Sequence, residues 1–310
     1  PLTSRLARWY RRVALRRTRI VVVVGSLGKT STAAAIRAAL GVRSDRTAGW
    51  NGAATAPFCV FAIAPSRETA VLEVGINGPG QMAPILRIIQ PDWVVVTSVA
   101  SEHNTAFKTL EATRAEKAEA VRGLAPSGIA FLNGDDANVR WMAGETRARL
   151  VRFGFGEDND VRAASACVQW PAGTSFRLHA GGAQREATIR LFGRHMVYAG
   201  LAAVAVGLEA GLELDGILAR LADLQPVPGR LELRPLANGA CLLADDFKSA
   251  RESMDAAFDV LDQIPAGGRK VVVLGPVAEP MGTQSAHYRA LGERIARAAQ
   301  LAVFVDCYRE

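Results

Sequence analysis

The stretch VVVVGSLGKTSTAAAIRAAL, residues 21–40, runs from four valines through a short turn bounded by glycines into an alanine-rich segment. A buried strand, a turn of small residues and a helix that begins at a lysine and a threonine are typical of a phosphate-binding loop. Backbone N–H groups and the positive end of the helix dipole then face phosphate oxygens. Lys29 would neutralise phosphate charge and Thr30 would bind Mg²⁺ through its hydroxyl group. The alternative is a glycine turn with an incidental lysine.

The same alternation of apolar runs and helical patterns continues along the chain. The strand and helix pairs lie at 20–24 and 29–40, 69–74 and 80–89, and 93–98 and 108–123. This order predicts an α/β fold with a mostly parallel sheet and helices on its faces. The segment 160–192 instead has short alternating stretches around glycine pairs, and we expect a small antiparallel excursion there.

A proline- and glycine-containing segment, QPVPGR at 225–230, marks the expected domain boundary. We therefore divide the chain into a basic N-terminal arm at 1–19, a central P-loop domain at 20–225 and a C-terminal domain at 226–310. The last of these shows only three strand patterns. We expect an incomplete Rossmann-like α/β domain that is truncated relative to a sheet of ordinary size.

The charge of the chain is concentrated at its start. Seven of the 37 lysines and arginines lie in the first 19 residues, and the other 30 equal the 30 aspartates and glutamates. Leu2, Leu6, Trp9 and Val13 recur at helical spacing among these arginines. The arm is therefore either a basic amphipathic helix for an anionic membrane surface or a solvated helix that packs Trp9 on the next domain. The chain has no 18-residue apolar run, which argues against a transmembrane span.

The four cysteines are far apart and form no C-x-x-C pair. This spacing indicates neither a zinc site nor a disulfide framework, so we expect reduced, mostly buried thiols and a bacterial cytoplasmic location. The cysteines are Cys59, Cys167, Cys241 and Cys307.

A carboxylate follows the second predicted strand in VLEVGINGPGQM, residues 71–82. Glu73 would lie at the carboxyl edge of the sheet, beside the phosphate loop, where a carboxylate suits Mg²⁺. A solvated charge at the strand end is the alternative for Glu73.

The short glycine spacing of GSLGKTST resembles the loop G-[ST]-x-G-K-[ST]-[ST] of the Mur ligase superfamily. This resemblance implies an enzyme that forms amide bonds with ATP and two Mg²⁺ ions. It assigns nucleotide binding to the loop residues and places Thr30 and Glu73 at the metal sites. The loop residues are Gly25, Ser26, Gly28, Lys29, Thr30 and Ser31.

Further segments resemble the MurF-type branch of that superfamily, in order from residue 20 to about 275. SVASEHNTAFKTLEATRAEKAEAV, residues 98–121, resembles the histidine loop and lysine helix. By this resemblance His103 helps to hold the second Mg²⁺, and Lys117 is a lysine that is commonly carbamylated and then binds metal. Lys29, Glu73, His103 and Lys117 thus become the expected catalytic residues.

Other matches concern substrate and domain closure. TAGWNGAATAP, residues 47–57, resembles the loop that contacts substrate, which implicates Thr47 and Asn51. PVPGRLELR at 226–234 and LADDFKSARESMDAAFDVL at 243–261 resemble the linker and the start of the last domain. The resemblance implies that Arg230 reaches the phosphates and Asp246 the ribose.

Several positions depart from the sequence pattern of the family. Met196 and Ala199 replace two asparagines that support the adenine, which leaves the base preference open. Lys248 and Arg251 place two cations where the family is neutral; either they suit an acidic substrate or they are surface charges. Only about twenty residues precede the loop, where MurF-type ligases carry a domain for the UDP-sugar end of their substrate.

These features predict an ATP-dependent ligase that joins an amino acid or small peptide to a carboxylate acceptor through an acyl phosphate. The acceptor is expected to differ from that of MurF, or a partner protein to assist. No nucleic acid is expected as a partner. The alternatives are a non-catalytic subunit of the same fold, a P-loop kinase or ATPase, and a ligase held at the inner face of the membrane by the basic arm.

Overall fold

The computed structural model describes residues 2–43, 50–100, 104–247, 249–265, 267–277 and 284–305. Its centre is an eight-stranded sheet with the order β2-β1-β3-β4-β5-β6-β7-β8. Strands β1 to β6 run parallel. Strand β7 pairs antiparallel with β6, and β8 pairs antiparallel with β7 at the edge of the sheet. This confirms the predicted α/β fold with its antiparallel excursion. The strands are β1 (Arg19–Val24), β2 (Thr69–Glu73), β3 (Trp93–Val96), β4 (Ile129–Asn133), β5 (Arg149–Gly154), β6 (Val161–Gln169), β7 (Gly173–Ala180) and β8 (Ala183–Ile189).

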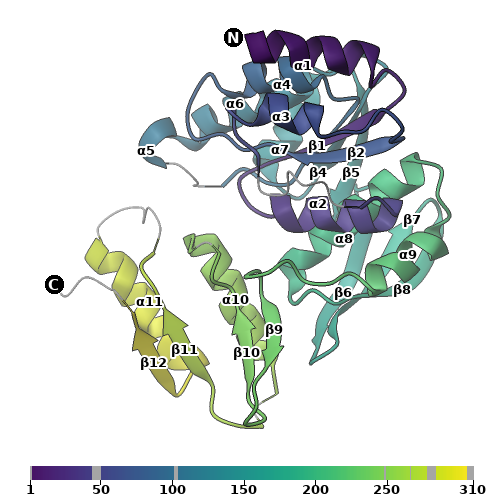
Figure 1. The fold of residues 1–310 in the computed structure, drawn as a ribbon. Helices are drawn as coiled ribbons and strands as arrows, with labels where there is room; N and C mark the ends of the chain where they lie inside the picture. Colours follow the sequence, from purple (N-terminus) through teal and green to yellow (C-terminus); the bar gives the residue numbers. More distant parts are fainter. Residues whose placement is uncertain are drawn as a thin grey trace.

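Helices cover both faces of the parallel strands, which explains why β1 is a continuous apolar run. Val21 and Val23 face one hydrophobic cluster, whereas Ile20, Val22 and Val24 face the other. On the second face lie α1 (Leu2–Val13), α3 (Ala56–Phe61), α4 (Met82–Ile89), α6 (Leu110–Arg122), α7 (Ala137–Trp141) and the 3₁₀ turn η1 (Met142–Glu145). On the first face lie α2 (Lys29–Leu40), α8 (Arg194–Glu209) and α9 (Leu214–Ala222), as Figure 1 shows. The short helix α5 (Asn104–Phe107) precedes α6.

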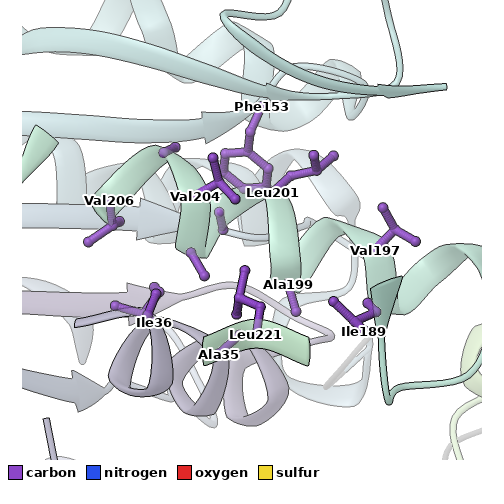
Figure 2. Close-up of a cluster of buried hydrophobic side chains, with 14 of the residues drawn as sticks. Ala35, Ile36, Phe153, Ile189, Val197, Ala199, Leu201, Val204, Val206 and Leu221 are labelled. Atoms are coloured by element: carbon purple, nitrogen blue, oxygen red, sulfur yellow. The ribbon is translucent and has the colours of Figure 1, made fainter. Parts of the chain in front are cut away.

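Helix α8 is buried over most of its length, between the sheet and α2 (Figure 2). Small residues such as Ala199 on α8 and Ala35 on α2 line this contact and let the two backbones approach closely. The alanine-rich sequence after the phosphate loop therefore has a packing role as well as a helix-forming one. Leu221 of α9 and Phe153 of β5 close the same cluster (Figure 2).

The C-terminal part contains two small sheets and two helices. Strands β9 (Glu232–Pro235) and β10 (Cys241–Ala244) pair antiparallel, and β11 (Val271–Leu274) and β12 (Leu301–Phe304) pair parallel. Helices α10 (Arg251–Gln263) and α11 (Gln284–Ala298) accompany them. Val260 of α10 belongs to the same buried cluster as α8, and the backbone N–H of Val168 donates to Gln263 Oε1 at 3.4 Å. The C-terminal part is thus in contact with the central sheet.

Two expectations about individual side chains were wrong. Cys59 is buried, but Cys167 and Cys241 are exposed, because β6 and β10 each turn one face to solvent. Trp9 does not pack on the next domain; its side chain is 61% exposed, and other residues of α1 face inward. Cys307 lies outside the described residues.

Candidate functional site

The phosphate loop leaves the carboxyl end of β1 and is held by the end of β3. Gly25 has φ +145°, and a Cβ there would lie 2.0 Å from Thr97 Oγ1. Thr97 Oγ1 donates a hydrogen bond to the carbonyl oxygen of Leu27 at 2.6 Å, and the N–H of Leu27 donates to Ser98 Oγ at 3.1 Å. The neighbouring strand approaches so closely that only glycine fits at position 25.

Helix α2 begins directly after the loop. Gly28 is its N-cap with φ +81°, and the first turn has no acidic residue and no side-chain cap. Thr30 is half-buried and Ser31 is buried in this turn, and the Ser26 hydroxyl accepts from the N–H of Ala100 at 2.9 Å. The open N-terminus of a twelve-residue helix presents N–H groups and a positive dipole end, which suits an anion.

Lys29 folds back over the loop. Its Nζ donates to the carbonyl oxygens of Gly25 at 2.9 Å and Ser26 at 2.8 Å. Burial lowers the pKa of Lys29 to about 8. The charge of Glu73 opposes this shift, and the charge of Arg230 adds a smaller lowering.

Lys117 reaches the same loop from α6. It is 3% exposed, and its Nζ donates to the carbonyl oxygen of Gly25 at 3.1 Å. Burial lowers the pKa of Lys117 to about 7; the charge of Lys29 lowers it further, and Glu116 opposes both. A lysine with so low a pKa is partly a neutral amine at physiological pH.

Glu73 ends β2, directly beside β1. The amide Nδ2 of Asn51 donates to Glu73 Oε1 at 3.1 Å, and the N–H of Gly75 donates to the carbonyl oxygen of Asn51 at 2.8 Å. The structure therefore brings Asn51 to Glu73. Thr47 and His103 lie outside the described residues.

Arg230 comes from the linker between the central and C-terminal parts. Its guanidinium lies 4.2 Å from the centre of the Phe247 ring. Burial lowers the pKa of Arg230, against the attraction of Asp245 and Glu73. The charge of Arg230 also lowers the pKa of Lys29, so the linker lies within electrostatic range of the phosphate loop.

Asp246 is exposed and adjoins this linker. Gly229 has φ +68°, and a Cβ there would lie 2.4 Å from Asp246 Oδ1, so the turn needs glycine. Arg251 is exposed at the start of α10 and forms a 3.8 Å ion pair with Asp255 on the same helix. Lys248 lies outside the described residues.

The two residues that replace the expected asparagines belong to the core. Met196 is 8% exposed and Ala199 is 3% exposed, both within the buried part of α8. Between them, the Tyr198 hydroxyl donates to Asp135 Oδ2 at 2.8 Å. Burial alone would raise the pKa of Asp135, but hydrogen bonds from Phe155, Gly156, Tyr198 and Asn159 hold it below its usual value.

A hollow of about 670 Å³ lies beside Asp135. This hollow was not predicted from the sequence, because its lining combines two separate stretches, residues 134–141 and residues 152–159. The lining residues are Gly134, Asp135, Ala137, Arg140, Trp141, Arg152, Gly156, Asp158 and Asn159.

Several supporting residues were not assigned to the site from the sequence. Asn133 Nδ2 donates to the carbonyl oxygen of Thr97 at 2.8 Å, and Asp136 Oδ2 accepts from the N–H of Val99 at 2.8 Å. Glu116, next to Lys117, accepts from the N–H groups of Gly80 and Met82, both at 2.8 Å. Asn133 ends β4 and Asp136 is the N-cap of α7, whereas Glu116 lies within α6. Their partners are far away in the sequence.

A glycine turn after a buried strand, an open helix N-terminus and three nearby cations define a P-loop phosphate-binding protein of the α/β class. The sequence model of the Mur ligase middle domain matches residues 23–207, more than half of the chain. The chain belongs to the Mur ligase family.

Individual ligases of this family are also similar to the chain in sequence. The chain is 32% identical over 292 residues to the UDP-N-acetylmuramoyl-tripeptide–D-alanyl-D-alanine ligase of Escherichia coli (strain K12) and 29% identical over 265 residues to that of Bacillus subtilis (strain 168). These matches cover 93% and 84% of this chain, but 64% and 57% of the two relatives. The chain therefore spans less than two thirds of their length.

Solved structures share the fold. MurF from Acinetobacter baumannii superposes with a TM-score of 0.87 at 24% identity, covering 97% of this chain and 66% of that one. MurF from Thermotoga maritima, in complex with ADP, gives a TM-score of 0.84 at 23% identity, covering 99% and 70%.

Proposed function

We propose that this chain is the nucleotide-binding and catalytic part of an ATP-dependent carboxylate–amine ligase of the MurF type. One observation carries the proposal: Lys29 and Lys117 both donate to the carbonyl oxygen of Gly25, and Arg230 is near enough for its charge to lower the pKa of Lys29. The positive charges of Lys29, Arg230 and the protonated fraction of Lys117 repel one another around this loop, and a polyphosphate would relieve that repulsion.

The residues fit ATP and Mg²⁺ by their chemistry. The start of α2 presents backbone N–H groups, and Lys29 Nζ donates to the carbonyl oxygens of Gly25 and Ser26 beside them. Thr30 and Glu73 supply the oxygen ligands that Mg²⁺ prefers. Within the described ranges, no three His, Cys, Asp or Glu side chains cluster as a protein-only metal site would require. The metal would then rely on phosphate oxygens as well, with His103 as the further ligand that the family resemblance implies.

The reaction has two substrate steps. An oxygen of the acceptor carboxylate attacks the γ-phosphorus of ATP, ADP leaves and an acyl phosphate forms. The amino group of the second substrate then attacks the acyl carbon, loses a proton and expels phosphate, which leaves an amide. Lys29 and Arg230 would stabilise the charge on the transferred phosphoryl group, and bound Mg²⁺ would add the same electrostatic support.

Lys117 has a second role in this proposal. A carbamate forms only from a neutral amine, and the lowered pKa of Lys117 supplies that form near pH 7. The carbamate carries a negative charge and would bind metal beside Glu73. It would also replace one of the three mutually repelling cations by an anion.

The names of the relatives suggest the first substrates to test. They act on a UDP-N-acetylmuramoyl tripeptide and D-alanyl-D-alanine. Asn51, hydrogen-bonded to Glu73, would position the acceptor beside the phosphoryl group, together with Thr47. Arg251 and Lys248 would favour an acidic group on either substrate.

The test is ligation assayed by mass spectrometry. The protein is incubated with Mg·ATP, the muramoyl tripeptide and D-alanyl-D-alanine, and then with a panel of other acid and amine pairs. We expect an amide product and equimolar ADP, both lost in Lys29→Ala. ATP hydrolysis that no acid and amine pair stimulates would instead support an ATPase, and a phosphorylated hydroxyl product would support a kinase.

A further inference from the structure

Helix α1 is fixed to the body of the protein by one of its faces. The Tyr10 hydroxyl donates to the carbonyl oxygen of Ile63 at 2.9 Å, and Arg11 Nη2 donates to Asp92 Oδ2 at 2.8 Å. Arg11 Nη1 also donates to the carbonyl oxygen of Leu15 at 2.6 Å. Ala7 and Arg11 are buried. The rotation of α1 about its axis is therefore set by contacts on this inner face.

The outer face of α1 carries an apolar stripe, which we define as Leu2, Leu6, Trp9 and Val13. These side chains are 71%, 48%, 61% and 52% exposed. Their spacing of four, three and four residues places them on one line along the helix. Helix α1 lies at the outer surface of the central part (Figure 1). Four large apolar side chains exposed on a single line are unlike scattered surface hydrophobics and indicate an interaction surface.

Arginines follow one flank of this stripe. Helical spacing places Arg5, Arg8 and Arg12 side by side, and all three are exposed. Arg16 and Arg17 follow the helix and are exposed as well. Residues 2–19 contain no aspartate or glutamate, so this surface is positive without local compensation.

We propose that the outer face of α1 binds the surface of an anionic lipid bilayer. The apolar stripe would enter the boundary between headgroups and acyl chains, while the flanking arginines contact lipid phosphates. Trp9 suits this boundary because an indole has an apolar body and one polar N–H. No helix in the described part of the chain has the length and apolar character to span a bilayer.

Charge favours this occupant over two others. A second copy of the chain would bring two arginine rows together, and like charges at such a contact repel. A nucleic acid would pair with the arginines but would leave the apolar stripe exposed to water. A bilayer of anionic lipids would both pair with the arginines and bury the apolar stripe.

The experiment is co-sedimentation of the protein with large vesicles, either phosphatidylcholine alone or phosphatidylcholine mixed with phosphatidylglycerol. We expect binding to the mixed vesicles to be at least about tenfold stronger than to the neutral ones, and to weaken as salt is raised. Leu6→Ser and Trp9→Ser should each weaken binding to mixed vesicles several-fold, whereas Trp9→Phe should retain it.

Matched controls separate this surface from general effects. Leu236→Ser removes a leucine of nearly equal exposure, 47%, after β9 and should not change binding. Arg5→Gln with Arg8→Gln should weaken binding more than Arg190→Gln with Arg289→Gln, which removes the same charge elsewhere. Equal loss in both double variants, equal binding to neutral vesicles, or no binding at all would overturn the proposal. Self-association that Trp9→Ser abolishes would assign the stripe to a second copy and would also overturn it.

Discussion

Lys29 and Lys117 share a hydrogen-bond acceptor: both Nζ atoms donate to the carbonyl oxygen of Gly25, at 2.9 and 3.1 Å. The two lysines come from helices on opposite faces of the sheet, α2 and α6. Their convergence on one carbonyl links the phosphate loop to the predicted carbamylation site. It also makes the charge state of this pair sensitive to pH.

The stability of the protein should therefore rise with pH above neutrality. The pKa values of Lys117 and Lys29 are lowered to about 7 and about 8, so the unfolded chain binds more protons between pH 7 and 10.5. The free energy of unfolding then increases with pH, by up to about 1.4 kcal/mol per pH unit for each lysine. The free energy of unfolding, measured with urea from pH 7 to pH 9, should increase less steeply with pH in Lys117→Met than in wild type. The exposed Lys108→Met is the control, and an equal reduction there would contradict the assignment.

Lys117 should react with carbon dioxide. Because its amine is partly neutral near pH 7, bicarbonate should produce a protein species heavier by the mass of carbon dioxide, measured by native mass spectrometry. The species should increase from pH 6 to pH 8, as the neutral fraction grows, and should be absent in Lys117→Arg. If the adduct persists in that variant, another amine carries it.

Gly25 should tolerate no side chain. Gly25→Ala places a Cβ 2.0 Å from Thr97 Oγ1 and imposes φ +145° on an alanine. We expect a loss of about 2 kcal/mol in the free energy of unfolding and a strong loss of nucleotide affinity. Gly144→Ala is the control, since nothing lies within 4 Å of its Cβ. Thermal unfolding and nucleotide titration of both variants check this, and equal behaviour would be inconsistent with the loop geometry.

Arg11 should be the main anchor of α1. It is 7% exposed and meets Asp92, whose Oδ2 also accepts from the N–H of Ile20 at 2.7 Å. Arg11→Met should lower the free energy of unfolding by about 2 kcal/mol, because Asp92 loses its charged partner and the carbonyl oxygens of Leu15 and Gln90 lose their donor. Arg12→Met, at an exposed position on the same helix, should change the free energy of unfolding by less than about 0.5 kcal/mol. Chemical denaturation measures both.

Much of the central fold could be predicted from the sequence, since its signals are local. The run of valines and the lysine that begins α2 gave β1 and α2 almost to the residue, because strand burial and helix starts depend on neighbouring residues. The short helix α3 and the strand β9 were not predicted, since each has too few residues for a clear period.

The site was predictable in its parts but not in its connections. The strand-end position of Glu73 and the loop motif were visible in the sequence, whereas the hydrogen bond from Asn51 to Glu73 spans 22 positions. The contact of Lys117 with Gly25 spans 92 positions, and only the order of the strands in the sheet brings them together. Trp9 is exposed because the face of α1 that carries Arg11 turns inward, and helical spacing alone does not show which face does so.

Transfer of oxygen from the acceptor to phosphate tests the proposed reaction most directly. The acceptor carboxylate is labelled with ¹⁸O, and the protein is incubated with it, Mg·ATP and the amine that supports turnover. An acyl phosphate predicts that each released phosphate carries one labelled oxygen, matched by one amide product, with both lost in Lys29→Ala. Unlabelled phosphate, released at the same rate without the amine, would contradict the ligase and assign the loop to an ATPase.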